Sequence, residues 1–207
     1  MKTPFFITAC RVAGVTLALS TGHSRADETA DNFSRSLEYT RAIVEKHHLT
    51  GLVDVDLGGG KKSFRYDHYP EVERIQAQGS TYARKKGKAW LKSDDWAETG
   101  KKVTKDKSEE LDNLITFVDA PLQNRSVSKD KSQGGMVVEE IKREPSGSGE
   151  RIFYEIRREK STGFGYPQFV FSRYGKDPDD KAMLIGYAGF MYSGEEKIHV
   201  NINYSYM

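Results

Sequence analysis

The side chains with the most evident chemistry in this chain are its histidines, which can act as general bases or as metal ligands. His47 and His48 are adjacent, but no third ligand stands at a recognisable metal-site spacing. The end of a helix also favours histidine, because a positive charge is stabilised there. The sequence therefore predicts no metal at this pair. His68 and His199, with many carboxylates, leave a general acid–base pair open as an alternative.

Short motifs elsewhere resemble ion-binding or catalytic sites but lack residues that the chemistry needs. Asp94-Asp95 and Asp179-Asp180 do not show the spaced oxygen pattern of a calcium loop. Gly60-Lys61-Lys62-Ser63 has no Gly-Lys-Ser/Thr triplet for a phosphate loop, and Ser126-x-x-Lys129 lies in a polar tract. Neither a His-Glu-x-x-His nor a Gly-x-Ser-x-Gly motif occurs. We therefore predict a protein that is not an enzyme, with no catalytic residue, metal or cofactor.

Both tryptophans of the chain lie in the stretch Tyr82–Val103, surrounded by charged residues. A large apolar ring among charges either enters a core or lies at the mouth of a binding site. We expect Trp90 to be buried and Trp96, which follows Asp95, to be partly exposed at the rim of a cavity. Substitution of Trp90 should then lower stability, whereas substitution of Trp96 should change ligand binding more than stability.

The N-terminus has the layout of a secretory signal peptide. Lys2 and Arg11 supply positive charge, 12–19 is a short apolar run, and Ser24-Arg25-Ala26 is a small-x-small cleavage site. The sequence therefore predicts a signal peptide over residues 1–26.

Cleavage of this segment has consequences for where the mature protein resides and for which partners its charge favours. The apolar run is far shorter than the roughly 20 residues of a spanning helix, so no transmembrane segment is expected. The sequence before Cys10 imitates a lipobox but precedes the longest apolar run, which disfavours a lipid anchor. Cleavage removes three of 32 basic residues and none of 30 acidic ones, so charge gives no argument for nucleic acid. A single periplasmic or secreted domain over 27–207, without cysteine, is predicted.

Two segments of this domain have helical periodicity. The first runs to about Val44, with apolar residues on one stripe and charged residues behind. The second is expected at 107–118, with Asp106 and Glu109 at capping-box spacing. Asp119-Ala120-Pro121 is expected to end it, because the residue before a proline disfavours helix.

Most remaining segments alternate between apolar and polar residues, which is typical of half-buried strands. We expect a hairpin within 50–69 and then strands at 72–78, 80–85, 89–93, 136–143, 151–159, 168–174, 183–192 and 197–206. One wet and one buried face indicate an antiparallel sheet. The predicted class is α+β: a strongly twisted antiparallel sheet, or half-open barrel, of about nine or ten strands. Two or three helices are expected to pack on its concave face or to cover it as a lid.

The order of these elements resembles that of a known superfamily. A signal peptide and amphipathic helix precede the strand Thr50-Gly51-Leu52-Val53-Asp54-Val55, a meander, and then Arg84-Lys85-Lys86-Gly87-Lys88-Ala89-Trp90-Leu91-Lys92. This layout is similar to that of the periplasmic lipoprotein carriers, which include LolA and the lipid-binding LppX/LprG group. The resemblance implies an unclosed barrel that holds acyl chains, with Leu111–Leu122 as its lid, and it assigns no individual functional residue.

Two functions are consistent with this sequence. In the first, the protein shelters an apolar ligand, a lipid or a lipoprotein acyl chain, in the concave face of the sheet. The residues expected to contact that ligand are Trp90, Trp96, Tyr82, Phe117, Leu114 and Phe171. In the second, the protein is an interaction or scaffold module of the cell envelope with a filled core and working loops at 94–107 and 123–135.

Overall fold

The structure, a computed structural model, describes residues 25–56, 60–93, 100–123, 136–158, 167–174, 181–193 and 196–207. Nearly all of the predicted signal peptide lies outside the described residues, as do Trp96 and most of the loops predicted to carry an interaction surface.

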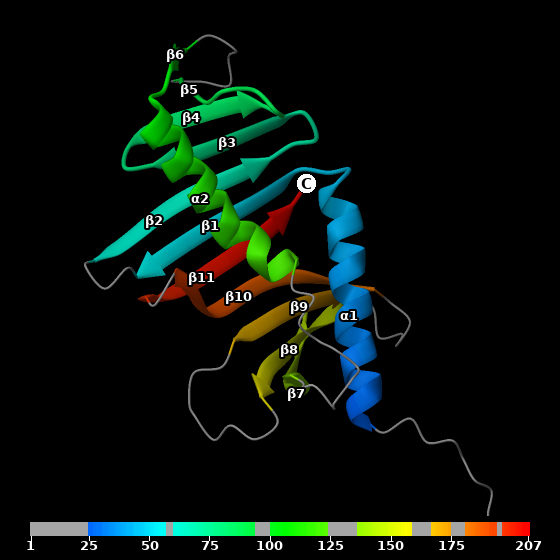
Figure 1. Ribbon diagram of the computed structural model, residues 1–207. Helices are drawn as coiled ribbons and strands as arrows, with labels where there is room; N and C mark the ends of the chain where they lie inside the picture. Colours follow the sequence, from blue (N-terminus) through cyan, green and yellow to red (C-terminus); the bar gives the residue numbers. More distant parts are fainter. Residues whose placement is uncertain are drawn as a thin grey trace, which may run out of the picture.

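A single open sheet of eleven strands, all paired antiparallel, forms the framework of the molecule (Figure 1). Its order is β6-β5-β4-β3-β2-β1-β11-β10-β9-β8-β7. The strands are β1 (Leu49–Asp56), β2 (Lys61–His68), β3 (Val72–Ala77), β4 (Ser80–Lys85), β5 (Leu91–Lys92), β6 (Lys101–Lys102), β7 (Met136–Ser146), β8 (Gly149–Arg158), β9 (Gln168–Tyr174), β10 (Ala182–Ser193) and β11 (Glu196–Tyr206).

The first and the last strands of the chain meet at the middle of this sheet. β1 and β11 pair along their length, from Leu49 opposite Tyr206 to Asp56 opposite His199. On each side of this pair the strands follow in chain order as a meander, because short turns connect antiparallel neighbours. The pairing of β1 with β11 therefore joins two meanders into one sheet.

Both helices lie on the same face of the sheet, which we call the covered face (Figure 1). It carries buried apolar residues of the strands, including Val53, Phe64, Phe171 and Ile202. α1 (Arg25–Val44) packs against β7 and β10, and α2 (Lys105–Leu122) crosses β1 and its neighbours. The alternation of β11 sets its buried face as predicted, with Ile198, Val200, Ile202 and Tyr204 turned inward.

A side chain of α1 fixes the helix to an irregularity of the sheet. β10 has a bulge between Leu184 and Gly186, which shifts its register with β9. The buried Thr40 hydroxyl accepts the Leu184 N–H at 3.0 Å and donates to the Ser36 carbonyl oxygen at 2.8 Å. A residue of the helix thus satisfies a backbone donor in the core.

The predicted α+β class is confirmed, and two details of the prediction are wrong. The sheet has eleven strands rather than nine or ten, because the two-residue β6 pairs with β5, the strand expected at 89–93. Helix α2 is longer than 107–118 at both ends. Its N-cap is Thr104, whose hydroxyl accepts the Lys107 N–H at 3.3 Å, while Asp106 lies in the first turn.

At its C-terminus α2 continues past the predicted stop. Pro121 lies within the last turn, and the helix ends at Leu122. Proline removes one backbone hydrogen bond, but Pro121 and Leu122 are both buried, and this burial offsets the loss. Sequence alone underestimates a helix end that tertiary packing stabilises.

Candidate functional site

Helix α2 packs closely on the sheet where β1 carries a glycine. A Cβ on Gly51 would lie 3.2 Å from Cγ1 of Val118, so the absence of a side chain lets the helix approach the strand. Leu111 and Ile115 extend the same stripe of α2, and all three side chains are buried. The Tyr204 hydroxyl of β11 donates to the Val118 carbonyl oxygen at 2.8 Å. The C-terminal half of α2 therefore rests directly on the central strands.

The N-terminal half of α2 is held mainly by polar contacts around one arginine. The Arg84 guanidinium of β4 bonds Glu73 of β3 and Asp112 of α2, the latter at 2.7 Å. Trp90 donates its indole N–H to Asp112 at 3.1 Å, and the Arg84 guanidinium lies 4.5 Å from the centre of the Trp90 ring. Ionic contacts of this partly exposed kind are exchangeable with water at small net cost.

A carboxyl group of α2 that faces the sheet, that of Asp119, is in an unfavourable environment. Burial and the nearby charge of Glu73 raise the pKa of Asp119 to about 6. The Tyr66 hydroxyl donates to Glu73 at 2.9 Å, and burial raises the pKa of Tyr66 as well. Burial lowers the pKa of the neighbouring His68. At neutral pH the underside of α2 therefore carries an ionised carboxylate that a loosened helix would hydrate better.

The structure brings four of the predicted ligand-binding residues to this region. Trp90 is fully buried, as predicted, and Tyr82 is buried with the Lys107 ammonium 5.1 Å from its ring centre. Leu114 and Phe117 of α2 are half-buried and pack against the core.

The fifth predicted residue lies elsewhere, and the sixth is not described. Phe171 is on β9, beneath α1, and its ring contacts Phe33 at 5.5 Å and Tyr154 at 5.6 Å between ring centres. It therefore belongs to a separate aromatic group of the core. Trp96 lies outside the described residues.

Sequence reasoning missed the charged residues of the site, Glu73, Arg84, Asp112 and Asp119. One signal was present: Asp112 and Asp119 are seven residues apart, which is two helical turns, and flank the apolar position Ile115. Carboxylates at the edge of the buried stripe of a helix indicate that charged groups contact the helix where it packs on the sheet.

A cluster of hydrogen-bonded polar side chains lies on the opposite face of the sheet, around Asp67. The Thr50 hydroxyl donates to Oδ1 of the fully buried Asp67 at 2.6 Å, and Nε2 of His48 lies 3.3 Å from the same oxygen. Arg65 also bonds Asp67, and the His48 ring stacks on Tyr69. Burial alone raises the pKa of Asp67, but hydrogen bonds from Arg65 and Thr50 outweigh it and lower that pKa. The ionised Asp67 therefore accepts hydrogen bonds from Thr50 and Arg65 and fixes the positions of these side chains.

No protein-family model matches the chain, and no curated protein sequence is significantly similar to it. Within the described ranges no helix is long and apolar enough to cross a membrane, and no three metal-ligating side chains gather. The resemblance to lipoprotein carriers stays a prediction.

Proposed function

We propose that this protein is a non-enzymatic periplasmic or secreted carrier that shelters an apolar ligand, a lipid or a lipoprotein acyl chain, between the covered face and α2. In this proposal the sheet acts as a half-open barrel and α2 as its lid. The observation that supports it is the way in which α2 packs on the sheet. An apolar stripe of the helix contacts the strands, Asp112 forms polar contacts with Arg84 and Trp90, and the carboxyl of Asp119 is partly buried at a cost in stability.

The side chains beneath α2 are suited to hold an acyl chain. Tyr66, Ile75, Tyr82 and Trp90 come from neighbouring strands and the segment after β4, and each is at most 8% exposed. Movement of α2 would uncover them together as one broad apolar surface. Such a surface is unfavourable in water at about 25 cal/mol per Å² and needs either the helix or a ligand to cover it.

The charges at α2 favour opening at low cost. Its contacts with Arg84 are partly exposed, and Asp119 is better hydrated when the helix moves away. A ligand can shift the equilibrium between the closed and open positions of α2 only by the difference between its affinities for the two states. The closed state of a lid must therefore be only slightly more stable than the open state.

A brominated acyl chain tests the location of the ligand, because bromine quenches tryptophan only in contact. In the full-chain variant Trp96→Phe the remaining tryptophan is Trp90, which is fully buried. We expect a bromostearate to quench this fluorescence and an unbrominated chain of equal length to leave it unquenched. Binding without quenching would place the ligand elsewhere, and absence of binding would overturn the carrier function.

A second candidate, an envelope interaction or scaffold module, is favoured by the packing under α1. There Phe33 contacts Tyr154, Phe169 and Phe171 edge-to-face with ring centres 5.1–5.5 Å apart. This part of the covered face is filled by its own side chains, as in a protein that uses only its surface. Native mass spectrometry of protein purified from its own cells separates the two: a co-purifying lipid supports the carrier, and a clean apo mass supports the module.

A further inference from the structure

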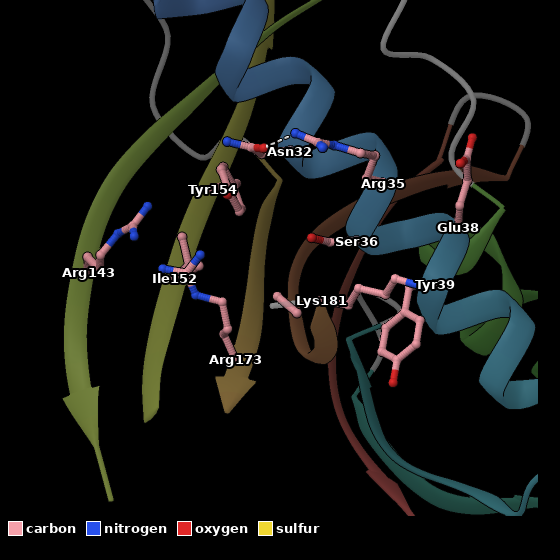
Figure 2. A pocket seen from close by; sticks show the side chains of 11 residues that line it. Asn32, Arg35, Ser36, Glu38, Tyr39, Arg143, Ile152, Tyr154, Arg173 and Lys181 are labelled. Carbon is pink, nitrogen blue, oxygen red and sulfur yellow. Dashed lines mark hydrogen bonds between the residues drawn. The ribbon is translucent and has the colours of Figure 1, made fainter. Parts of the chain in front are cut away.

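A cavity of about 300 Å³ lies at the opposite end of the sheet from β5 and β6, between α1 and the strands β7–β10 (Figure 2). We call it the arginine pocket. The lining residues that matter for its chemistry are Arg35, Ser36, Arg143, Tyr154, Arg173 and Lys181. Its volume is at the lower end of the range for small-ligand sites.

Positive charge dominates the lining of this pocket. Arg35 comes from α1, Arg143 from β7 and Arg173 from β9, and Lys181 directly precedes β10. Glu38 is the only acidic side chain that lines the described part of the pocket, and Figure 2 shows it pointing away from the arginines. An anion entering between helix and sheet would meet four cations, of which Arg143 and Arg173 are paired with Glu140 and Glu150.

Carboxylates behind the wall hold two of these arginines in place. Arg143 bonds both oxygens of Glu140, at 2.9 and 2.7 Å, and also reaches Glu150 at 3.1 Å. Arg173, only 8% exposed, bonds the same oxygen of Glu150 from the other side. Figure 2 shows Arg143 and Arg173 reaching toward the strand between them. This arrangement positions the guanidinium groups before a ligand arrives, which reduces the ordering cost of binding.

Two hydroxyl groups complete the lining. The Tyr154 side chain is 2% exposed, and neither its hydroxyl nor that of Ser36 forms a hydrogen bond within the part of the chain described. Burial raises the pKa of Tyr154 to about 12, so this hydroxyl stays a donor at neutral pH. Both side chains line the pocket, so an anion held there can accept a hydrogen bond from each hydroxyl.

We propose that the arginine pocket binds a phosphate-ester anion. Arginine and lysine donors with two hydroxyls match a tetrahedral group that has several acceptor oxygens. The rim cations Arg35 and Lys181 are exposed and would contact the anion directly, while Arg143 and Arg173, each paired with a glutamate, offer hydrogen-bond donors from the wall. A lipid headgroup and a soluble phosphate ester share this chemistry.

The lipid source rests on the function proposed above and has its own structural support. The ring of Tyr154 forms part of the pocket and also contacts Phe33 and Phe171 at 5.5 and 5.6 Å. The polar pocket is therefore continuous with the aromatic core of the covered face. An apolar chain attached to a phosphate group held here would start at the edge of that packed core.

Calorimetric titration of the full chain with four ligands distinguishes these sources. The ligands are inorganic phosphate, glycerol 3-phosphate, dihexanoyl-phosphatidylglycerol below its micelle concentration, and dihexanoylglycerol, which lacks phosphate. We expect phosphatidylglycerol to bind at least about tenfold more tightly than dihexanoylglycerol, since one charge-assisted hydrogen bond supplies about that factor. Equal binding of glycerol 3-phosphate and phosphatidylglycerol would support the anion site and exclude the lipid source. No preference for a phosphate-bearing ligand would overturn the proposal.

Matched variants assign any preference to the pocket. The double variant Arg35→Gln, Lys181→Gln changes two exposed residues and should lose about tenfold in affinity for phosphatidylglycerol. The control Lys61→Gln, Lys62→Gln removes the same charge from exposed positions on β2 and should bind as the natural chain does. Tyr154→Phe, which removes only the hydroxyl, should lose a few-fold.

Failure of this proposal and failure of the carrier function give different results. Quenching of Trp90 by bromostearate tests the acyl site alone, and we expect it to persist in the double variant Arg35→Gln, Lys181→Gln. An unchanged headgroup preference in that folded double variant would overturn the arginine pocket and leave the acyl site intact. Absence of bromostearate binding to the Trp96→Phe chain would instead overturn the carrier function.

Discussion

Replacement of Asp119 by asparagine should stabilise the protein at neutral pH. The carboxyl group of this α2 residue faces the sheet near Glu73, and burial followed by that charge raises its pKa from 3.8 to about 6. Asparagine has nearly the same shape and no ionised form. The variant therefore removes the cost of burying a charge and preserves the packing of the helix.

The magnitude follows from the two pKa values of Asp119. Between pH 4 and 6 the unfolded chain releases a proton that the folded protein retains, so the free energy of unfolding falls as pH rises. The accumulated loss is up to about 3 kcal/mol and is constant above pH 6. Below pH 4 both states bind the proton and the loss vanishes. Asp119→Asn should thus equal the natural chain near pH 3.5 and exceed it by up to about 3 kcal/mol at pH 7.5.

Urea unfolding of both proteins at a series of pH values measures this difference directly, because titration of all other groups cancels in the comparison. Asp106→Asn, at an exposed position in the first turn of the same helix, is the control and should differ from the natural chain by less than about 0.5 kcal/mol throughout. A difference for Asp119→Asn that does not grow between pH 4 and 6, or a less stable variant at pH 7.5, would refute the reasoning.

Three further substitutions test how the core is held together, each by urea unfolding. Thr40→Val should cost about 1–3 kcal/mol because it leaves the Leu184 N–H buried without an acceptor, and Thr40→Ser should retain most of the stability. Gly149→Ala would place a Cβ 1.9 Å from the Arg173 carbonyl oxygen, so β8 and β9 must separate, at a cost of about 2 kcal/mol or more. Trp90→Ala should cost about 3–5 kcal/mol, the range for a fully buried large aromatic side chain.

Local periodicity predicted the long strands well. The last strand was expected at 197–206 and is found at Glu196–Tyr206, because strict alternation leaves one way to bury its apolar side. β6 consists only of Lys101–Lys102, and no side-chain pattern predicts it. It exists through pairing with β5, so an isolated sequence window contains no signal for it.

The site was predictable only in its apolar half. A tryptophan among charges indicates burial, and Trp90 is buried. Its partner Asp112 is 22 residues away on a helix, and the contact arises only when α2 docks on the sheet. The arginine pocket is even harder to predict from the sequence, because Arg35 and Arg173 are far apart in the chain. Long-range pairing of charges has no local periodicity to reveal it.

A disulfide between α2 and β1 tests the central claim, that the ligand enters beneath α2. Cγ1 of Val118 lies 3.2 Å from the Cβ position of Gly51, within the reach of a disulfide after both residues become cysteine. Replacing Cys10 with serine removes the only natural cysteine. The controls are the reduced double variant Gly51→Cys, Val118→Cys and each single variant. We predict that the oxidised protein stays folded but no longer takes up bromostearate, and that reduction restores uptake. Equal uptake by the oxidised and reduced proteins would contradict the role of α2 as a lid.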